Sequence, residues 1–242
     1  MDRRPMRVLV IDIGGTHVKL AIAGERRVVK TPSGKDLTPA VMVRRVLAAT
    51  EGWEYDVVTI GYPGPVRKGR PAAEPVNIGK GWMRHDFQKA FGCPVRMIND
   101  AAMQALGSYR GGRMLFLGLG TGLGNAVVEG GRVEPMEVGH LPYREGKSFE
   151  DYLGVAGLER LGRRKWERHV HTVVEMLRQA LLADYVVLGG GNVKKLTTLP
   201  PHCRRGDNRL AFRGGGRLWA DDNPVVAPAR RPRNRTAARK AR

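Results

Sequence analysis

Short apolar runs that end at glycine, proline or polar residues recur along the chain and predict buried β-strands. Residues 8–11 form the first run, and residues 18–23 form the next after a turn of glycine and threonine. The same order of strand, turn and strand returns at residues 114–117 and 125–128. We therefore expect one β-hairpin design in each half of the chain.

Apolar positions spaced three and four residues apart predict helices between these strands. The expected helices span residues 38–50, 86–91, 99–109 and 166–182. Further strands are expected near residues 26–31 and at residues 57–60, 95–98 and 185–188. Strands that alternate with helices in this way predict an α/β protein.

The glycine-rich segment at residues 107–113 marks a boundary, because the strand–turn–strand pattern restarts after it. We expect an N-terminal α/β lobe at residues 1–111, a C-terminal α/β lobe at residues 112–220 and a basic disordered tail at residues 221–242. Two such lobes with a cleft between them correspond to the two-lobed, actin-like or ribonuclease-H-like fold, which clamps a nucleotide.

Two glycine–threonine turns join the paired strands: the first hinge loop, residues 12–16, and the second hinge loop, residues 118–122. Glycines let backbone N–H groups approach an anion closely, and Thr16 and Thr121 each add a hydroxyl donor. Neither loop has the form of a dinucleotide-binding or Walker motif. Ordinary hairpin turns are the alternative interpretation. The duplication, and the carboxylate of Asp12 where a phosphate-bound metal would lie, favour phosphate binding.

The composition limits the kinds of partner. Of 242 residues, 42% are hydrophobic, and the formal net charge is +19. Such a field attracts polyanions, but much of it falls in the arginine-rich segment after Asp222, so we do not expect a nucleic-acid partner. No apolar stretch approaches a membrane span or a signal sequence, which predicts a cytoplasmic protein without a membrane partner. Cys93 and Cys203 are too few for a disulfide framework or a cysteine-based zinc site.

Short segments of the chain, in their order and spacing, resemble the ROK (repressor, open reading frame, kinase) family of sugar kinases, and within it the polyphosphate-glucokinase type. The matching segments are residues 12–16 with Lys19, 61–65, 77–82, 99–101, 120–122, 137–140 and 189–191. The resemblance extends over nearly the whole chain, to about Trp219.

In that family the aspartate that matches Asp100 is the catalytic base. A carboxylate suits this role, because it must accept the proton of a sugar hydroxyl as the oxygen attacks phosphorus. From the local sequence alone, a helix N-cap is the commoner role for such an aspartate. The two roles are compatible if Asn99 supplies the cap.

The resemblance also implies a set of sugar-binding residues, because amides and carboxylates can fix the positions of sugar hydroxyls. The expected residues are Gly64, Asn77, Asn99, Glu137, His140 and Glu150. For Glu150 the alternative is a solvated carboxylate in the first turn of a helix. For Glu137 and His140 it is a polar loop.

The phosphoryl donor, ATP or inorganic polyphosphate, is expected against the two hinge loops and a third glycine run. The expected donor-binding residues are Asp12, Gly14, Gly15, Thr16, Lys19, Gly120, Thr121, Gly122, Gly189, Gly190 and Gly191. Asp12 would also position Mg²⁺ through water. A tight strand-to-helix turn is the alternative interpretation of the last three glycines.

The chain departs from the family at one place. Many members carry a zinc-binding cysteine cluster between the equivalents of His140 and Glu150, with the histidine as a ligand. Residues 141–149 contain no cysteine here, so we expect no zinc. His140 is then expected to bind the sugar or to orient Glu137.

These features together predict a hexose kinase, a glucokinase by resemblance, and a homodimer is expected on the same ground. A sugar-binding regulator without turnover is one alternative, but the family's repressors carry a helix-turn-helix segment for which the first strand at Val8 leaves no room. A degraded kinase is the other. Intact Asp12, Asn99, Asp100 and Glu137 argue against it.

Overall fold

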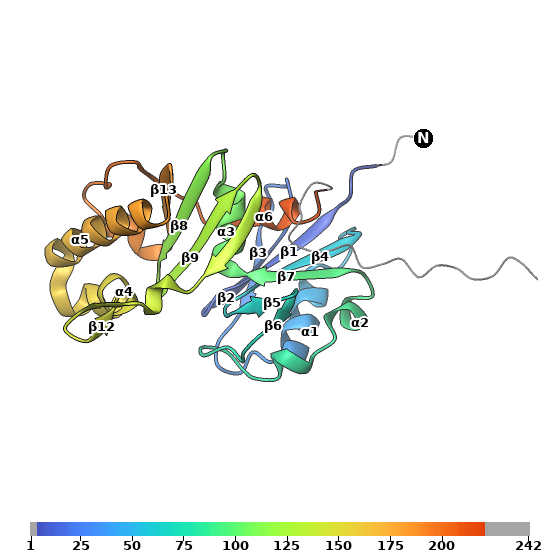
Figure 1. Cartoon of the computed structure of the whole chain (residues 1–242). Helices are drawn as coiled ribbons and strands as arrows, with labels where there is room; N and C mark the ends of the chain where they lie inside the picture. Colours follow the sequence, from blue (N-terminus) through green and yellow to red (C-terminus); the bar gives the residue numbers. More distant parts are fainter. Residues whose placement is uncertain (1–3, 221–242) are drawn as a thin grey trace, which may run out of the picture.

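The computed structural model describes residues 4–220 and contains two five-stranded sheets (Figure 1). The first sheet has the strand order β3-β2-β1-β4-β7. Its strands are β1 (Val8–Ile13), β2 (His17–Ile22), β3 (Val29–Pro32), β4 (Val57–Tyr62) and β7 (Val95–Asn99). Strand β1 pairs antiparallel with β2 and parallel with β4. The predicted tail at residues 221–242 lies outside the described residues.

The second sheet repeats this plan with the order β10-β9-β8-β13-β14. Its strands are β8 (Arg113–Leu119), β9 (Leu123–Glu129), β10 (Arg132–Met136), β13 (Tyr185–Gly189) and β14 (Cys203–Arg205). Strand β8 again pairs antiparallel with the next strand and parallel with β13. The shared order confirms the duplicated hairpin and the two-lobed α/β class. The boundary near residue 111 stays a prediction.

Helices and small hairpins complete the chain. The helices are α1 (Pro39–Ala49), α2 (Phe87–Phe91), α3 (Asp100–Ser108), α4 (Phe149–Leu153), α5 (Val155–Ala180) and α6 (Leu210–Arg217), with short 3₁₀ turns η1 (Trp82–Arg84), η2 (Val138–His140) and η3 (Gly191–Lys195). The hairpins pair β5 (Val66–Arg67) with β6 (Arg70–Pro71), and β11 (Pro142–Arg144) with β12 (Lys147–Ser148). No helix within residues 4–220 is long and apolar enough to cross a membrane.

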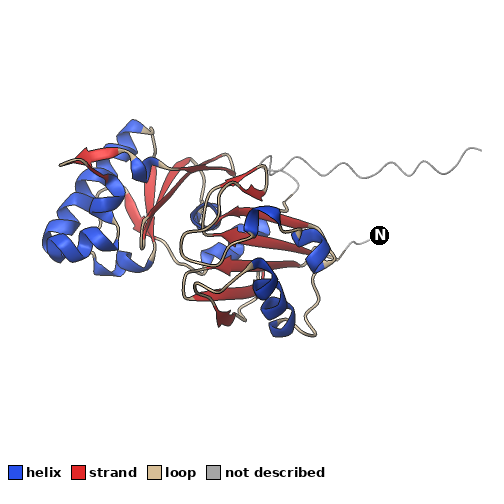
Figure 2. Ribbon diagram, turned by 90° about the horizontal axis from the view of Figure 1, so that it is seen from below, coloured by secondary structure: helices blue, strands red, loops and turns tan. Residues whose placement is uncertain are grey.

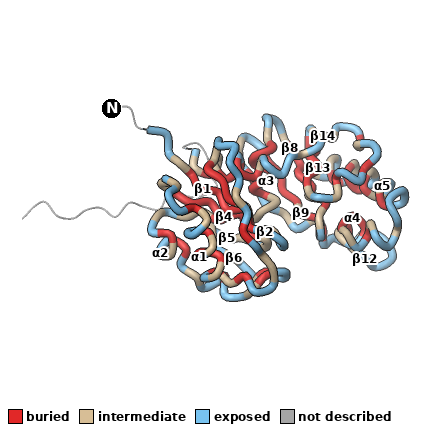
Figure 3. Tube along the Cα trace, turned by 180° about the vertical axis from the view of Figure 1, so that it is seen from behind, coloured by how far each residue is buried: buried red, intermediate tan, exposed pale blue. Residues whose placement is uncertain are grey.

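The two sheets lie on either side of α3 and α6, and other helices cover their outer faces (Figures 1 and 2). Alternation along each strand produces these layers, since successive side chains point to opposite faces. On β1, Val8 and Val10 pack toward the central helices, whereas Leu9 and Ile11 pack in the cluster that includes residues of α1. Both faces of the central strands are therefore buried (Figure 3), as expected for parallel strands covered by helices.

The central helices α3 and α6 pack almost backbone to backbone. A Cβ atom at Gly107 of α3 would overlap the carbonyl of Leu210, and one at Gly214 of α6 would overlap the carbonyl of Met103. We call this contact between α3 and α6 the seam. A buried hydroxyl joins the seam to the first sheet, because Thr59 Oγ1 donates to the carbonyl of Gly215 at 2.8 Å. The last described helix is thus joined to β4 of the first sheet.

Helix α5 differs from the sequence-based expectation, and helix α6 was not expected from the sequence. Helix α5 begins at Val155, well before the predicted start at residue 166, and Gly162 interrupts its helical geometry with a φ of 71°. Helix α6 forms although it contains three successive glycines, because their missing side chains allow the close approach to α3 and β1. Tertiary packing therefore overrides the poor helix propensity of glycine.

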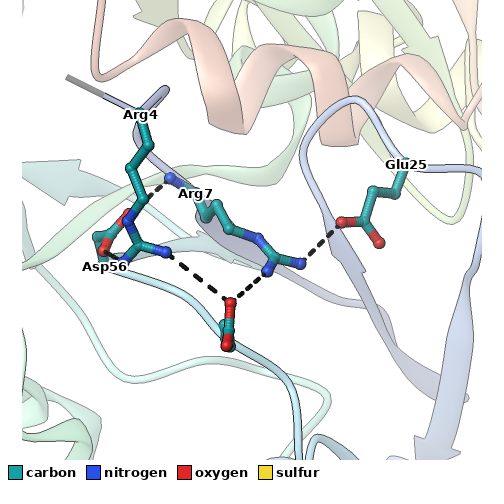
Figure 4. Close-up of polar contacts among 5 residues, drawn as sticks. Arg4, Arg7, Glu25 and Asp56 are labelled. Atoms are coloured by element: carbon teal, nitrogen blue, oxygen red, sulfur yellow. Dashed lines mark hydrogen bonds and ion pairs between the residues drawn. The ribbon is translucent and has the colours of Figure 1, made fainter. Parts of the chain in front are cut away.

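Ion pairs stabilise the end of the first sheet at which its central strand, β1, begins (Figure 4). Arg7 contacts Glu25 and Glu54 at 3.0 and 2.9 Å, and Arg4 Nη2 lies 2.7 Å from Asp56 Oδ1. Asp56 also accepts a hydrogen bond from the backbone N–H of Arg7. These arginines lie at the opposite end of β1 from Asp12, so they fix the strand and stand apart from the first hinge loop.

Candidate active site

Both hinge loops border one cavity of about 590 Å³, which receives residues from both sheets. The cavity brings together most of the predicted site residues, namely Asp12, Gly14, Gly15, Gly64, Asn77, Asn99, Asp100, Gly120, Thr121, Gly122, Glu137, His140, Glu150 and Gly190. These residues come from strand ends and turns far apart in sequence. Ligands of α/β sheets commonly bind at the carboxyl ends of strands, where loops of the fold converge.

Asp12 lies on β1, opposite Lys19 on β2 in the antiparallel register. Its carboxylate is largely buried, and Oδ2 lies 3.2 Å from Lys19 Nζ. A buried charge is costly without a partner, and the ammonium group supplies one. Lys19 itself is not among the residues that line the cavity.

Asp100 is the first residue of α3 and faces the cavity. Desolvation, followed by the nearby negative charge of Asp12, raises the pKa of Asp100 to about 7. The charge of Glu137 acts in the same direction, while a 2.8 Å hydrogen bond from the backbone N–H of Ala101 opposes it. A carboxylate with a pKa near neutrality can accept a proton at physiological pH and remain a useful base.

Asn99 supplies the N-cap of α3, which leaves Asp100 without that role. The side-chain oxygen of Asn99 accepts from the backbone N–H of Ala102 at 3.1 Å. Its Nδ2 atom donates to the carbonyl of Gly64 at 3.1 Å. One amide therefore fixes both the start of α3 and the loop after β4, on two sides of the cavity.

The second hinge loop is held by the α4–α5 region. Glu150 Oε2 accepts from the backbone N–H of Leu123 at 2.9 Å, and its carboxylate lies where a side chain on Gly122 would otherwise be. The carbonyl of Gly120 accepts from Val155 N and from Asn192 Nδ2. Glu150 thus has a structural contact in addition to its place in the cavity.

Glu137 precedes the 3₁₀ turn η2 and His140 is its last residue, and both line the cavity. Their side chains are mostly exposed, and His140 Nδ1 lies 4.0 Å from Glu137 Oε2. Asn125 of β9 fixes this turn, because its side chain donates to the carbonyl of Leu123 and accepts from the backbone N–H of Val138. The two polar side chains are available to a ligand.

Four predicted residues do not line the cavity: Thr16, Lys19, Gly189 and Gly191. At Gly189 a Cβ atom would press on Phe116 and on Gln104 Oε1, and Gly190 adopts a φ of 84° against the backbone of Leu119. Close packing accounts for these two glycines, in line with the tight-turn interpretation. Their contact with a donor stays a prediction.

Sequence reasoning missed two polar residues that line the cavity, Gln104 and Asn125. Gln104 lies one helical turn after Asp100 on α3, and its Nε2 atom donates to Asn208 Oδ1 at 3.2 Å. The four-residue spacing from Asp100 is the signal that places it on the same helix face. Asn125 is buried within an otherwise apolar strand, which is the signal there.

Comparison with known proteins places the chain in a family. The family model described as ROK family matches residues 8–145. The chain belongs to the ROK family. This ROK protein is 28% identical over 211 residues to the polyphosphate glucokinase of Mycobacterium tuberculosis, a match that covers 76% of this chain and 77% of the relative.

Other proteins similar to this ROK protein have names that give different sugars. The N-acetylmannosamine kinase of Escherichia coli O157:H7 is 31% identical over 146 residues, which cover 53% of this chain and 49% of the relative. The solved inorganic polyphosphate/ATP-glucomannokinase of Arthrobacter sp. strain KM shares the fold, with a TM-score of 0.74, 23% identity and coverage of 88% and 97% of the two chains. The protein is thus related to sugar kinases.

Proposed function

We propose that this ROK protein is a hexose kinase that transfers a phosphoryl group from ATP or inorganic polyphosphate to the 6-hydroxyl of glucose. One observation carries the proposal: a carboxylate with a pKa near 7, that of Asp100, faces a cavity bordered by two glycine–threonine loops. A phosphoryl donor and a hydroxyl acceptor need these two features side by side.

In this proposal Asp100 accepts the proton of the sugar hydroxyl as its oxygen attacks the terminal phosphorus of the donor. Asn77, Asn99, Glu137 and His140 would orient the sugar through its hydroxyl groups. The backbone N–H groups of the hinge loops would bind the phosphates. Polyphosphate as a donor is supported by the polyphosphate glucokinase relative.

Mg²⁺ fits the donor side of this cavity. No group of three or more His, Cys, Asp or Glu side chains within residues 4–220 could hold a metal ion alone. Mg²⁺ usually takes one or two protein carboxylates and completes its shell with waters and substrate phosphates. Asp12, whose charge reaches Asp100 across the cavity, offers such a carboxylate. When bound, the ion would neutralise charge on the transferred group.

The test is the formation of sugar 6-phosphate by the purified protein with Mg²⁺. ATP and polyphosphate are compared as donors, and glucose, mannose and N-acetylmannosamine as acceptors. We expect turnover with glucose, and Asp100→Asn serves as the matched inactive control. Sugar binding without product for every pair of substrates would instead support a regulator that binds sugar without turnover.

A further inference from the structure

The loop between β6 and η1, residues 72–81, brings Asn77 and Ile78 to the cavity. Pro75 and Ile78 are buried, but Val76 and Asn77 between them are exposed, Val76 to 94%, so core packing does not hold these two residues at the tip of the loop. Loops without such packing are mobile unless hydrogen bonds fix them. The position of Asn77 therefore depends on how the two ends of this loop are joined.

The carboxylate of Glu74 joins them. Its Oε2 atom accepts from the backbone N–H groups of Gly81 and Trp82 at 2.9 and 3.1 Å. Its Oε1 atom accepts from the N–H of Met83 at 3.3 Å. Three successive N–H groups at the start of η1 thus converge on one side chain, as they would on an anion.

The ionised form of Glu74 suits this role. Desolvation acts to raise the pKa of the carboxyl group, but the three backbone donors and the charge of Lys80 outweigh it and lower the pKa below its usual value. Hydrogen bonds to charged groups are stronger than those between neutral groups. We call Glu74 with its three N–H donors the Glu74 clamp. Its carboxylate is ionised throughout the neutral pH range.

The surroundings of the loop are rigid on either side of Asn77. Trp82 is fully buried, stacks on Phe87 and donates from Nε1 to the carbonyl of Gly79 at 2.6 Å. Tyr62 donates from its hydroxyl to the carbonyl of Ala73 at 2.8 Å. Glu74 is the charged group that connects these two anchored ends.

We propose that Glu74 is a positioning residue that holds Asn77 in place for the hexose. This inference rests on the proposed function, because Asn77 is assigned to the sugar there. Glu74 does not line the cavity, so it acts through the loop and not on the substrate. Its loss should weaken hexose binding and leave the donor side unchanged.

Steady-state kinetics of Glu74→Ala test whether hexose binding is weakened while donor binding is unchanged. We expect the hexose KM to rise roughly tenfold or more, as for the loss of hydrogen bonds to a charged group, while kcat and the donor KM change less than about twofold. Glu167→Ala is the matched control, because the Glu167 carboxylate also accepts from two backbone N–H groups, those of Thr197 and Thr198, in a loop outside the cavity. An unchanged hexose KM, or an equal rise in the donor KM, would overturn the proposal.

A double-mutant cycle with Asn77→Ala asks whether Glu74 acts through Asn77. If it does, the double variant should have nearly the hexose KM of Asn77→Ala alone, because the clamp then has no amide to position. Fully additive effects of the two substitutions would mean that Glu74 acts elsewhere and would remove the proposal.

Hydrogen–deuterium exchange without substrate separates this inference from the proposed function. Glu74→Ala should speed exchange in residues 74–83 and leave exchange in the strands of the first sheet unchanged. If Glu74→Ala exchanges faster but the wild-type protein shows no turnover, the kinase proposal is wrong and the role of Glu74 in holding the loop stands. Unchanged exchange in an active kinase would remove the clamp and retain the kinase.

Discussion

The carboxylates of Asp12 and Asp100 face the same cavity, and the charge of Asp12 reinforces the desolvation that raises the pKa of Asp100 to about 7. The base must be deprotonated to accept a proton. We therefore expect kcat/KM for the hexose to be constant above about pH 7 and to fall about tenfold per pH unit below it, because this ratio reports the free enzyme. Initial rates between pH 5.5 and 8.5, with donor and hexose both well below their KM values, measure the profile. A flat profile down to pH 5.5 would contradict the assignment of Asp100.

Replacement of the base should separate chemistry from binding. Asp100→Asn keeps the shape of the side chain and loses the proton acceptor, so we expect kcat to fall by roughly 10²–10⁴-fold. Sugar affinity, measured by calorimetry, should remain within a few-fold of the wild-type value. Retained turnover in this variant would remove the proposed mechanism.

The same substitution should stabilise the free protein in a manner that depends on pH. The pKa of Asp100 is higher in the folded state than its ordinary value of 3.8. The folded state therefore binds more protons than the unfolded state between about pH 4 and 7, and the free energy of unfolding falls as pH rises through this window. The penalty is fully present above pH 7. Asp100→Asn removes it, and each kcal/mol regained raises Tm by about 2–4 °C.

Thermal unfolding at pH 8 and pH 4 checks this sign. Asp100→Asn should melt several degrees above the wild type at pH 8, and the difference should shrink toward zero at pH 4. Asp86→Asn is the control, since Asp86 caps α2 at an exposed position where Asn is an equally good cap. An equal gain at both pH values would mean that the charge of Asp100 is not its source.

Because α3 and α6 pack closely, one methyl group added between them should lower the free energy of unfolding. Gly214→Ala would place Cβ on the carbonyl of Met103, so the helices must separate, and we expect a loss of about 1–3 kcal/mol in the free energy of unfolding. Gly191→Ala is the control, because among residues 4–220 no atom beyond Gly191 and its two chain neighbours lies within 4 Å of the added Cβ. Urea denaturation measures both. Equal stability of the two variants would show that the seam is looser than described.

Strands and hinge loops could be predicted from the sequence, because their signals are local. The strand β8 and the second hinge loop repeat the pattern of β1 and the first, and the structure confirms both hairpins with matching strand order. The start of α3 was also readable, since Asn99 and Asp100 favour a helix N-terminus, but only the structure shows which of them is the cap.

Helices α5 and α6 could not be predicted in full, because their limits depend on contacts distant in sequence. Gly157 and Gly162 lower the helix propensity of the early part of α5, and Gly162 interrupts its helical geometry. In α6, three successive glycines have poor helix propensity, and only the proximity of Met103 and Val10 makes them suitable for a helix. Gln104 entered the site for a similar reason: no motif marks it, and its place on the helix that carries Asp100 brings it there.

The seam between α3 and α6 has a consequence for synthesis on the ribosome. Phe212 and Leu218 pack in the central cluster with Val8, Val10 and Met103, so the last described helix completes a core that begins with the first strand. A nascent chain that has emerged only as far as β14 leaves this face of the first sheet uncovered, with the hydroxyl of Thr59 lacking the Gly215 carbonyl. The N-terminal sheet therefore cannot complete its core before α6 is available, and we expect it to need protection from aggregation until residues 210–218 have left the ribosome.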